Sequence, residues 1–482
     1  MLFNSIAFLV FFPLVTILYY LLPHAFRWML LLAASCVFYM YFIPVYILIL
    51  FITILIDYTA AIYIEKHKGR ARHNLLIISI ISTCLVLFVL KYFNFFLDNA
   101  SFVGGLFKAG YAIPHASIIL PIGLSFHTFQ SLSYVIEVYR GHQKAERHFG
   151  IYSLYVMFYP QLVAGPIERP QNLLVQFREK HKAEYENLVN GLRLILFGLF
   201  IKMVIADNLA PLVDQIYKNP AAYSSASIIS GLFLYSFQIY SDFYGYSTIA
   251  CGCALAMGFR LMDNFQTPYL SRNIGEFWRR WHISLSTWFR DYIFLPLAYA
   301  ISGKLKKDKY AGMKTDRLIF FLAMTITFFL SGLWHGANWT FVCWGLLLAS
   351  FFLAETWFNR TFKVKQHKKN FGFLHILLSL KTFVLITIAW VFFRSPGFAT
   401  VQEIFRSIFR NFSTHDDFHL STKVLVVLAI FLLSDFLLFN GRFDTWCARQ
   451  KSLIRWSIYT FMIFSILVLA GVEMYPFIYF QF

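Results

Sequence analysis

The chain has 482 residues, of which 59% are hydrophobic, 20% aromatic and only 14% charged. Soluble domains carry roughly 25% charged residues and about 45–50% apolar ones. This composition excludes a soluble globular enzyme, a disordered protein and a secreted disulfide scaffold. We therefore expect an all-α, polytopic membrane protein.

Lys and Arg outnumber Asp and Glu by 42 to 24, which gives a formal net charge of +18. Such an excess fits nucleic-acid binding, an anionic ligand or the cationic cytoplasmic loops of a membrane protein. Because the sequence has no soluble basic domain, nucleic acid is not an expected partner, and we favour the loop explanation. The six cysteines show no metal-ligand spacing with histidine, so no metal site is expected.

Apolar runs of about 20 residues, long enough to cross a bilayer, follow one another along the chain. The predicted segments are 6–22, 27–43, 44–64, 74–97, 117–139, 188–206, 226–260, 318–334, 339–358, 371–393, 421–439 and 453–474. The shorter run 151–165 ends in Ala164-Gly165-Pro166 and is typical of a re-entrant segment, and 263–295 is expected at the interface. We predict about 11–13 membrane segments in a single domain, 1–482.

Clusters of Lys and Arg predict the orientation of these segments. The basic loops are Lys66–Arg72, Arg140–Arg147, Lys304–Arg317, Arg360–Lys369 and Arg442–Arg455. The stretches 98–116 and 411–420 between them are nearly free of basic residues. The positive-inside rule places the basic loops in the cytoplasm. Both termini then lie outside, so the tail 475–482 is predicted to be extracytoplasmic.

His335 is the first candidate catalytic residue. The stretch 318–358 lies between two basic loops and must cross the membrane an even number of times, which predicts a tight turn at 335–338. An ionisable side chain at this depth is costly and indicates function, and an imidazole can accept a proton from an alcohol. Asn338 would supply amide donors nearby. The alternative is a histidine that satisfies a helix break by hydrogen bonding.

A Trp-rich, cationic stretch, Glu276–Tyr292, is the second candidate. Asn273 is predicted to cap a helix here, with Glu276 reaching back to complete the cap. The residues expected to share one face at 4-3-4 spacing are Trp278, His282, Leu285 and Phe289. Arg279 and Arg290 would lie on a neighbouring face. Such a helix fits either a groove for an anionic or acyl ligand or a plain interfacial anchor.

Two further polar stretches interrupt apolar sequence. Tyr240–Ser247 contains hydroxyls and one carboxylate, Asp242, and such clusters often hold membrane helices together. Gln161–Arg169 suits a turn at the membrane face. The residues alone therefore indicate a membrane protein with two histidines, which fits acyl transfer or a proton-coupled transporter.

Six segments resemble, in order, motifs of the membrane-bound O-acyltransferase family, most closely its bacterial alginate O-acetyltransferase branch. They are Leu2-Phe3-Asn4-Ser5, Leu120-Pro121-Ile122-Gly123-Leu124-Ser125-Phe126, Ala164-Gly165-Pro166-Ile167, Asp242-Phe243-Tyr244-Gly245-Tyr246-Ser247, Phe277-Trp278-Arg279-Arg280-Trp281-His282 and Gly332-Leu333-Trp334-His335-Gly336-Ala337-Asn338. The resemblance covers essentially the whole chain.

This resemblance implies a ring of transmembrane helices around a central catalytic funnel, in the bacterial inner membrane. It implies that His335 is the catalytic histidine and His282 the second one. The supporting residues would be Asn338, Trp334, Asp242 and Arg279. Acetyl-CoA would enter by a cytoplasmic tunnel as the acyl-donor substrate, with no bound cofactor. The acetyl group would end on a hydroxyl of an exported or cell-surface polysaccharide.

The last six residues, 477–482, match a Phe-x-Tyr-x-x-Phe tail found in relatives that work with a separate extracytoplasmic transferase. The resemblance implies that Tyr479 carries the acyl group as a phenol ester to an SGNH-type partner (AlgJ-, AlgX- or DltD-like). A phenol is both a nucleophile and a leaving group. The alternative is an aromatic anchor in contact with membrane lipids.

Other functions stay open on the sequence. Within the family, the alternatives are D-alanyl transfer to teichoic acid, peptidoglycan O-acetylation and lipid acylation. Outside it, the alternative is a polytopic transporter that exports a glycan or moves protons.

Overall fold

The structure is a computed structural model. It describes residues 1–106, 115, 121–310, 312–362, 372–412, 415–439, 441–470 and 475–478. Its regular elements in these ranges are helices and one antiparallel pair of two-residue strands, β1 (Lys309–Tyr310) and β2 (Met313–Lys314). The predicted all-α class is therefore confirmed. By contacts the chain divides into two compact units, Met1–Ile195 with Tyr246–Met262, and Leu196–Gly245 with Asp263–Phe482.

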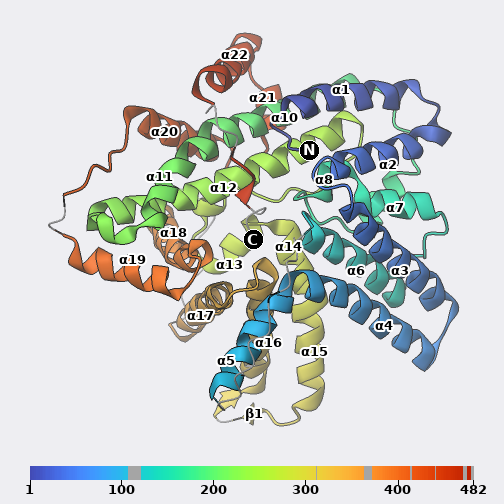
Figure 1. Ribbon diagram of the computed structural model, residues 1–482, viewed down its shortest axis with the longest axis horizontal. Coiled ribbons are helices and arrows are strands. Elements are labelled where there is room, and N and C mark those ends of the chain that lie inside the picture. The colour runs from blue at the N-terminus through green and yellow to red at the C-terminus, as the bar shows by residue number, and fades with distance from the viewer. Residues whose placement is uncertain are drawn as a thin grey trace. The chain divides into compact units, whose positions relative to one another are not determined.

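The helices follow the apolar runs of the sequence (Figure 1). Up to residue 222 they are α1 Ile6–Leu21, α2 His24–Met40, α3 Tyr46–Lys66, α4 Gly69–Leu87, η1 Phe88–Tyr92, α5 Phe93–Leu106, α6 Leu124–Arg140, α7 Phe149–Met157, α8 Tyr159–Leu162, α9 Pro170–Gln176, α10 Tyr185–Phe200, η2 Ile201–Ala206, α11 Asp207–Lys218 and η3 Pro220–Ala222. Beyond it they are α12 Ser225–Ala256, η4 Pro268–Leu270, α13 Ile274–Arg280, α14 Ile283–Phe289, η5 Arg290–Phe294, α15 Leu295–Lys304, α16 Thr315–His335, α17 Trp339–Thr361, α18 Phe373–Arg394, α19 Phe398–Arg410, α20 Thr422–Leu437, α21 Phe443–Ala448 and α22 Ser452–Leu469.

Seven helices in the described part of the chain are long and apolar enough to cross a membrane. They are Tyr46–Lys66, Gly69–Gly105, Tyr185–Lys218, Thr315–His335, Trp339–Thr361, Phe373–Arg394 and Ser452–Leu469. Each corresponds to a predicted segment, so the protein is a multi-pass membrane protein. The runs 6–22, 27–43, 226–260 and 421–439 and the described part of 117–139 also contain helices, but these are shorter or less apolar, and their crossing stays a prediction. The ring arrangement and the single domain also stay predictions.

In the first unit, α3, α4 and α6 pack side by side (Figure 1). The contact includes a buried carboxylate on α3, Asp57, which accepts hydrogen bonds from the Ser79 Oγ at 2.9 Å and the Thr83 Oγ1 at 2.8 Å, both on α4. A polar group inside a membrane segment is tolerated when a neighbouring helix supplies its partners. This cluster therefore holds helices together. The run 151–165 is broken at Phe158, between α7 and α8.

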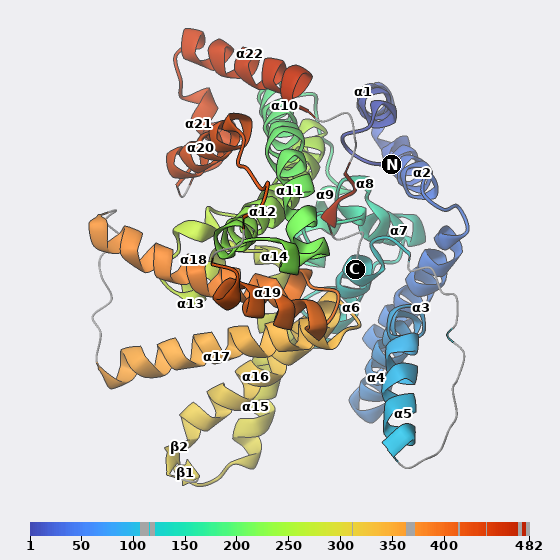
Figure 2. The same ribbon diagram turned by 60° about the vertical axis from the view of Figure 1, so that its left-hand side comes forward.

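In the second unit, α15, α16, α17 and α18 pack in succession, and Figure 2 shows the first three converging. The predicted turn at 335–338 is confirmed, since α16 ends at His335 and α17 begins at Trp339. The two helices approach closely because residue 332 is glycine. A Cβ there would lie 2.4 Å from the backbone oxygen of Phe341. This hairpin places His335 at the end of a long apolar helix.

Candidate active site

His335 lies in an aromatic box built by three consecutive helices. Its ring centroid is 4.9 Å from that of Trp334, 4.8 Å from that of Trp344 on α17, and 5.1 Å from that of Phe393 on α18. All three contacts are edge-on, and the His335 side chain is buried. The box fixes the orientation of the imidazole and keeps bulk water away from it. A preoriented base in a dry site is well placed for proton transfer.

Asn338 has a structural task that the sequence did not suggest. It is the N-cap of α17, where its Oδ1 accepts from the backbone N–H of Thr340 at 3.0 Å. Its Nδ2 donates to the backbone oxygen of Pro396 at 2.8 Å, between α18 and α19. Asn338 thus joins the ends of three helices around His335. Its predicted role in orienting reactants stays a prediction.

The predicted helix through His282 is wrong. The helix ends at Arg280, and α14 begins at Ile283 with His282 as its N-cap residue in a left-handed conformation, φ 42°. Trp278, Leu285 and Phe289 therefore do not share a continuous helical face with His282. A left-handed conformation is strained for a residue with a side chain, and such residues gather at functional sites. The break turns the imidazole of His282 into the protein interior, where it is 1% exposed.

The break is imposed by a segment earlier in the chain. The backbone oxygen of Asn264 accepts from Ile283 N at 3.0 Å, and its Oδ1 accepts from the Ser284 Oγ at 2.6 Å. Two residues further along the same segment, Gln266 N donates to the backbone oxygen of Arg280 at 3.0 Å. These bonds take up backbone groups that a continuous helix would pair internally. The 4-3-4 spacing that predicted a continuous helix through His282 carries no information about the Asn264 segment.

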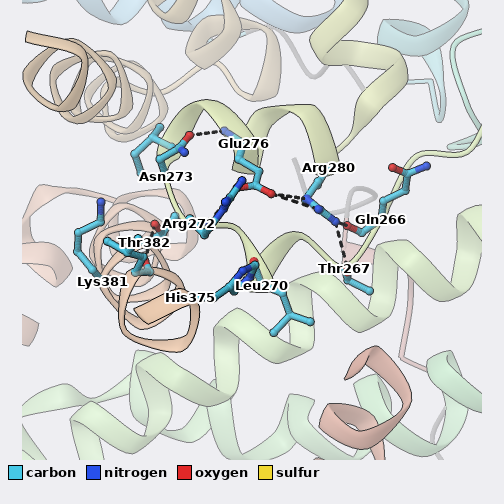
Figure 3. Close-up of polar contacts among 12 residues, drawn as sticks. Gln266, Thr267, Leu270, Arg272, Asn273, Glu276, Arg280, His375, Lys381 and Thr382 are labelled. Carbon is cyan, nitrogen blue, oxygen red and sulfur yellow. Dashed lines mark hydrogen bonds and ion pairs between the residues drawn. The ribbon is translucent and has the colours of Figure 1, made fainter. Parts of the chain in front are cut away.

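The Glu276 carboxylate bonds to residues at both ends of α13 (Figure 3). The predicted cap is confirmed, because the Asn273 Oδ1 accepts from Glu276 N at 2.7 Å. Glu276 does reach back, but it accepts from the backbone N–H of Arg272 at 3.2 Å rather than from that of Asn273. Its carboxylate also pairs with the side chains of Arg272 at 3.0 Å and Arg280 at 3.1 Å. Arg280 further donates to the Thr267 Oγ1 at 3.3 Å, and Thr267 shares the left-handed conformation of His282.

The two histidines meet at Trp334. Its ring centroid is 6.3 Å from that of His282 and 4.9 Å from that of His335. On its other side, His282 contacts Phe243 of α12 edge-on at 4.6 Å. Burial lowers the pKa of His282 from its ordinary 6.5 to about 3, so this imidazole is neutral near pH 7. A neutral imidazole with so low a pKa is a hydrogen-bonding group and a weak base.

Two cavities lie along α16. Half of the residues that line a cavity of about 260 Å³ are aromatic, and this cavity reaches Ser331, one turn before His335. The residues Trp278, Leu285 and Phe289 line it, together with one charged side chain, Arg290. A second cavity of about 610 Å³ lies towards the start of α16, with Arg317 and Arg360 in its wall. Phe320 lines both cavities. The larger cavity thus carries two guanidinium groups in its wall, and the smaller one ends one helical turn short of His335.

Asp242 and Arg279, both predicted as supporting residues, lie apart from this box. Asp242 pairs with Lys202 at 2.6 Å, although its neighbour Phe243 contacts His282. Arg279 is exposed on α13. Tyr479, the predicted acyl carrier, lies outside the described residues.

Two residues near the site were missed in the sequence. Arg280 was not singled out, because its partners depend on the fold. Lys202 carried a readable signal, since it is a charged residue inside the apolar run 188–206. Among the described residues, no three His, Cys, Asp or Glu side chains group as a metal site.

Residues 142–395, which contain both histidines, match the model of a family described as MBOAT, membrane-bound O-acyltransferase family. The matched segment includes the aromatic box and the break at His282.

Three similar proteins extend this match over most of the chain. The "Probable alginate O-acetylase AlgI" of Azotobacter vinelandii is 33% identical over 413 residues, 85% of this chain and 78% of the relative. The protein of the same name from Pseudomonas aeruginosa is 34% identical over 418 residues, 85% of this chain and 75% of the relative. The "Peptidoglycan O-acetyltransferase" of Helicobacter pylori is 32% identical over 405 residues, 78% of this chain and 73% of the relative.

Proposed function

Because the chain belongs to the membrane-bound O-acyltransferase family, we propose that this O-acyltransferase moves acetyl groups from cytoplasmic acetyl-CoA towards hydroxyls of an exported or cell-surface polysaccharide. The similar proteins from Azotobacter vinelandii and Helicobacter pylori are named for O-acetyl transfer, to alginate and to peptidoglycan. Membership of an enzyme family also removes the transporter alternative.

The observation that carries the proposal is the meeting of two buried histidines at Trp334, one helical turn beyond the Ser331 end of the smaller cavity. His335 acts as the general base. It takes the proton of the acceptor hydroxyl while the hydroxyl oxygen attacks the thioester carbonyl. The carbon–sulfur bond then breaks, the acetyl group stays on the acceptor oxygen, and the CoA thiolate takes the proton from His335. His282, neutral near pH 7, positions the thioester by hydrogen bonding.

The cavities along α16 suit the donor. The larger one offers Arg317 and Arg360 to the phosphates of CoA, and guanidinium groups bind phosphate well. The smaller, apolar one accommodates the thioester arm and ends beside Ser331. This path supports entry from the side of the basic loops, which the positive-inside rule assigns to the cytoplasm. The proposed orientation leaves the C-terminus extracytoplasmic.

The acceptor at this site, in our proposal, is the phenol of Tyr479. The acetyl-tyrosine ester would then pass its acetyl group to an extracytoplasmic transferase of the SGNH type, which modifies the polysaccharide. A carrier on the enzyme itself explains how a small, buried site serves a polymer that is too large to enter it.

Purified protein in liposomes, supplied with acetyl-CoA labelled in the acetyl group, tests this function. We expect label on the C-terminal peptide of the wild type and none in Tyr479→Phe. The control Tyr299→Phe, which removes an exposed phenol, keeps the label. Absence of label from the protein and from added polysaccharide would contradict acetyl transfer. Label found on lipid would favour lipid acylation. In a parallel assay with a carrier protein bearing labelled D-alanine, transfer from that carrier and none from acetyl-CoA would favour the teichoic acid alternative.

A further inference from the structure

The last described segment of the chain, 475–478, is buried in the second unit. Phe477 is 1% exposed and Ile478 is 3% exposed. The ring of Phe477 packs against Phe243 at 5.4 Å, and Phe243 contacts His282 at 4.6 Å. Segment 475–478 therefore lies one aromatic ring away from His282, and Tyr479 is the next residue in the sequence.

A buried ion cluster lies beside this segment. The Lys202 Nζ is 2.7 Å from the Asp207 Oδ1 and 2.6 Å from the Asp242 Oδ1, and all three side chains are 5–6% exposed. Lys202 belongs to η2, Asp207 is the first residue of α11, and Asp242 lies within α12. One ammonium faces two carboxylates, so the ionised cluster carries a net negative charge. Buried charge of this kind is stable only when further hydrogen-bond donors face it.

Segment 475–478 supplies such a donor. The backbone N–H of Ile478 donates to the Asp242 Oδ2 at 2.7 Å. The Lys202 Nζ in turn donates to the backbone oxygen of Tyr475 at 3.2 Å. Both bonds are charge-assisted, and such bonds are about twice as strong as bonds between neutral groups. The cluster thus holds a four-residue segment at both ends through its backbone.

Local helix geometry builds this cluster. Lys202 lies in the π-helical turn η2, and π-helical turns are frequent at functional sites. α12 comes close to it because residue 245 is glycine. A Cβ there would lie 2.8 Å from the backbone oxygen of Gly198 and 2.9 Å from Lys202 N. Asp242, one turn earlier on α12, then reaches the lysine.

We propose that Lys202, Asp207 and Asp242 form a receptor for the C-terminal backbone. The receptor holds residues 475–478 against Phe243, close to His282, and so fixes the segment that directly precedes Tyr479 in the sequence. The three residues are positioning residues and take no part in bond making. The inference rests on the proposed function only in its last step, where Tyr479 carries the acetyl group.

Hydrogen exchange of the full-length protein tests the receptor without any chemistry. The Ile478 amide should exchange slowly in the wild type and roughly ten- to a hundredfold faster in Asp242→Ala. This variant leaves Lys202 paired with Asp207, so a buried unpaired charge is avoided. The matched control is Asp435→Ala, which removes a buried carboxylate that bonds to Tyr240 in the same unit. It should leave the Ile478 exchange rate unchanged. Equal exchange in Asp242→Ala and the wild type would overturn the receptor.

A substitution on the tail separates the receptor from the proposed function. Ile478→Pro removes the N–H donor and leaves the cluster intact, whereas Ile478→Ala keeps the donor and shortens the side chain. We expect Ile478→Pro to lower kcat for Tyr479 acetylation at least tenfold at unchanged KM for acetyl-CoA, with a smaller effect of Ile478→Ala. Full acetylation in Ile478→Pro would overturn the receptor and leave the function standing. Slow exchange of Ile478 without acetylation of Tyr479 in the wild type would support the receptor and remove the carrier role.

Discussion

At the scale of single residues, the two histidines have different surroundings and suit different tasks. His335 sits at a helix end inside three aromatic rings, where its imidazole is oriented for proton transfer. His282 sits in a left-handed turn with its pKa lowered by burial to about 3. An imidazole with so low a pKa holds a proton poorly, so it is a weak base and a suitable hydrogen-bond partner for a thioester. In the proposed mechanism His335 is the base and His282 is the hydrogen-bonding partner.

The lowered pKa of His282 has a consequence for stability. The folded state favours the neutral imidazole, so its contribution is fully present above the ordinary pKa of 6.5 and is lost as the pH falls towards 3. The loss amounts to about 1.4 kcal/mol per pH unit in this window. In thermal unfolding in detergent, His282→Gln should therefore show a weaker fall of Tm between pH 6.5 and pH 5 than the wild type.

The control for this experiment is Ser379→Ala, which removes a buried hydroxyl and no titratable group. It should keep the pH dependence of the wild type. An unchanged fall of Tm in His282→Gln would show that His282 is not held neutral by burial.

At the scale of elements, the α16–α17 hairpin positions the base. The two helices meet at Gly332, where any side chain would collide with the backbone of Phe341. Asn338 then caps α17 and bonds to Pro396, which ties the hairpin to the end of α18. The aromatic box around His335 depends on this spacing, because Trp344 and Phe393 come from α17 and α18.

Gly332→Ala tests the hairpin. The added methyl group forces α16 and α17 apart, and overpacking of this kind costs about 1–3 kcal/mol. We expect a lower Tm and slower acetyl transfer. The matched variant Gly303→Ala places the same methyl group on α15, where no atom lies within 4 Å, and should have neither effect. A Gly332→Ala protein as stable and active as Gly303→Ala would contradict the role of the close approach.

The elements also show how far the sequence predicts this protein. Long apolar runs and the basic loops around 318–358 predicted the spans and the turn at His335, because hydropathy and charge are local properties. The helix break at His282 could not be predicted from hydropathy and charge. It depends on Asn264, which lies 18 residues earlier and contacts Ile283 and Ser284 only in the folded chain. The ion cluster was missed for a related reason, since Lys202 and Asp242 are 40 residues apart.

At the scale of the whole molecule, composition and function are connected through the membrane. Scarce charge produces the long apolar helices, and the charged residues that remain inside them, such as Lys202 and Asp242, are paired. The excess of Lys and Arg includes Arg317 and Arg360, which line the larger cavity. The proposed path therefore runs along α16 from these arginines to His335. In the proposed function, this organisation moves an acetyl group between compartments without moving the polymer.

The rate of acetyl transfer by His335→Ala tests this account most directly. The control is His375→Gln, which removes a buried imidazole that bonds to the Leu270 backbone oxygen. Both variants are reconstituted in liposomes at equal amounts of folded protein, and transfer from labelled acetyl-CoA is followed. Loss of a general base typically lowers a rate by about 10²–10⁴-fold, which is the fall that we predict for His335→Ala, with His375→Gln near the wild type. Transfer by His335→Ala within about threefold of the control, far short of the loss expected for a general base, would contradict the assignment of His335 as the base.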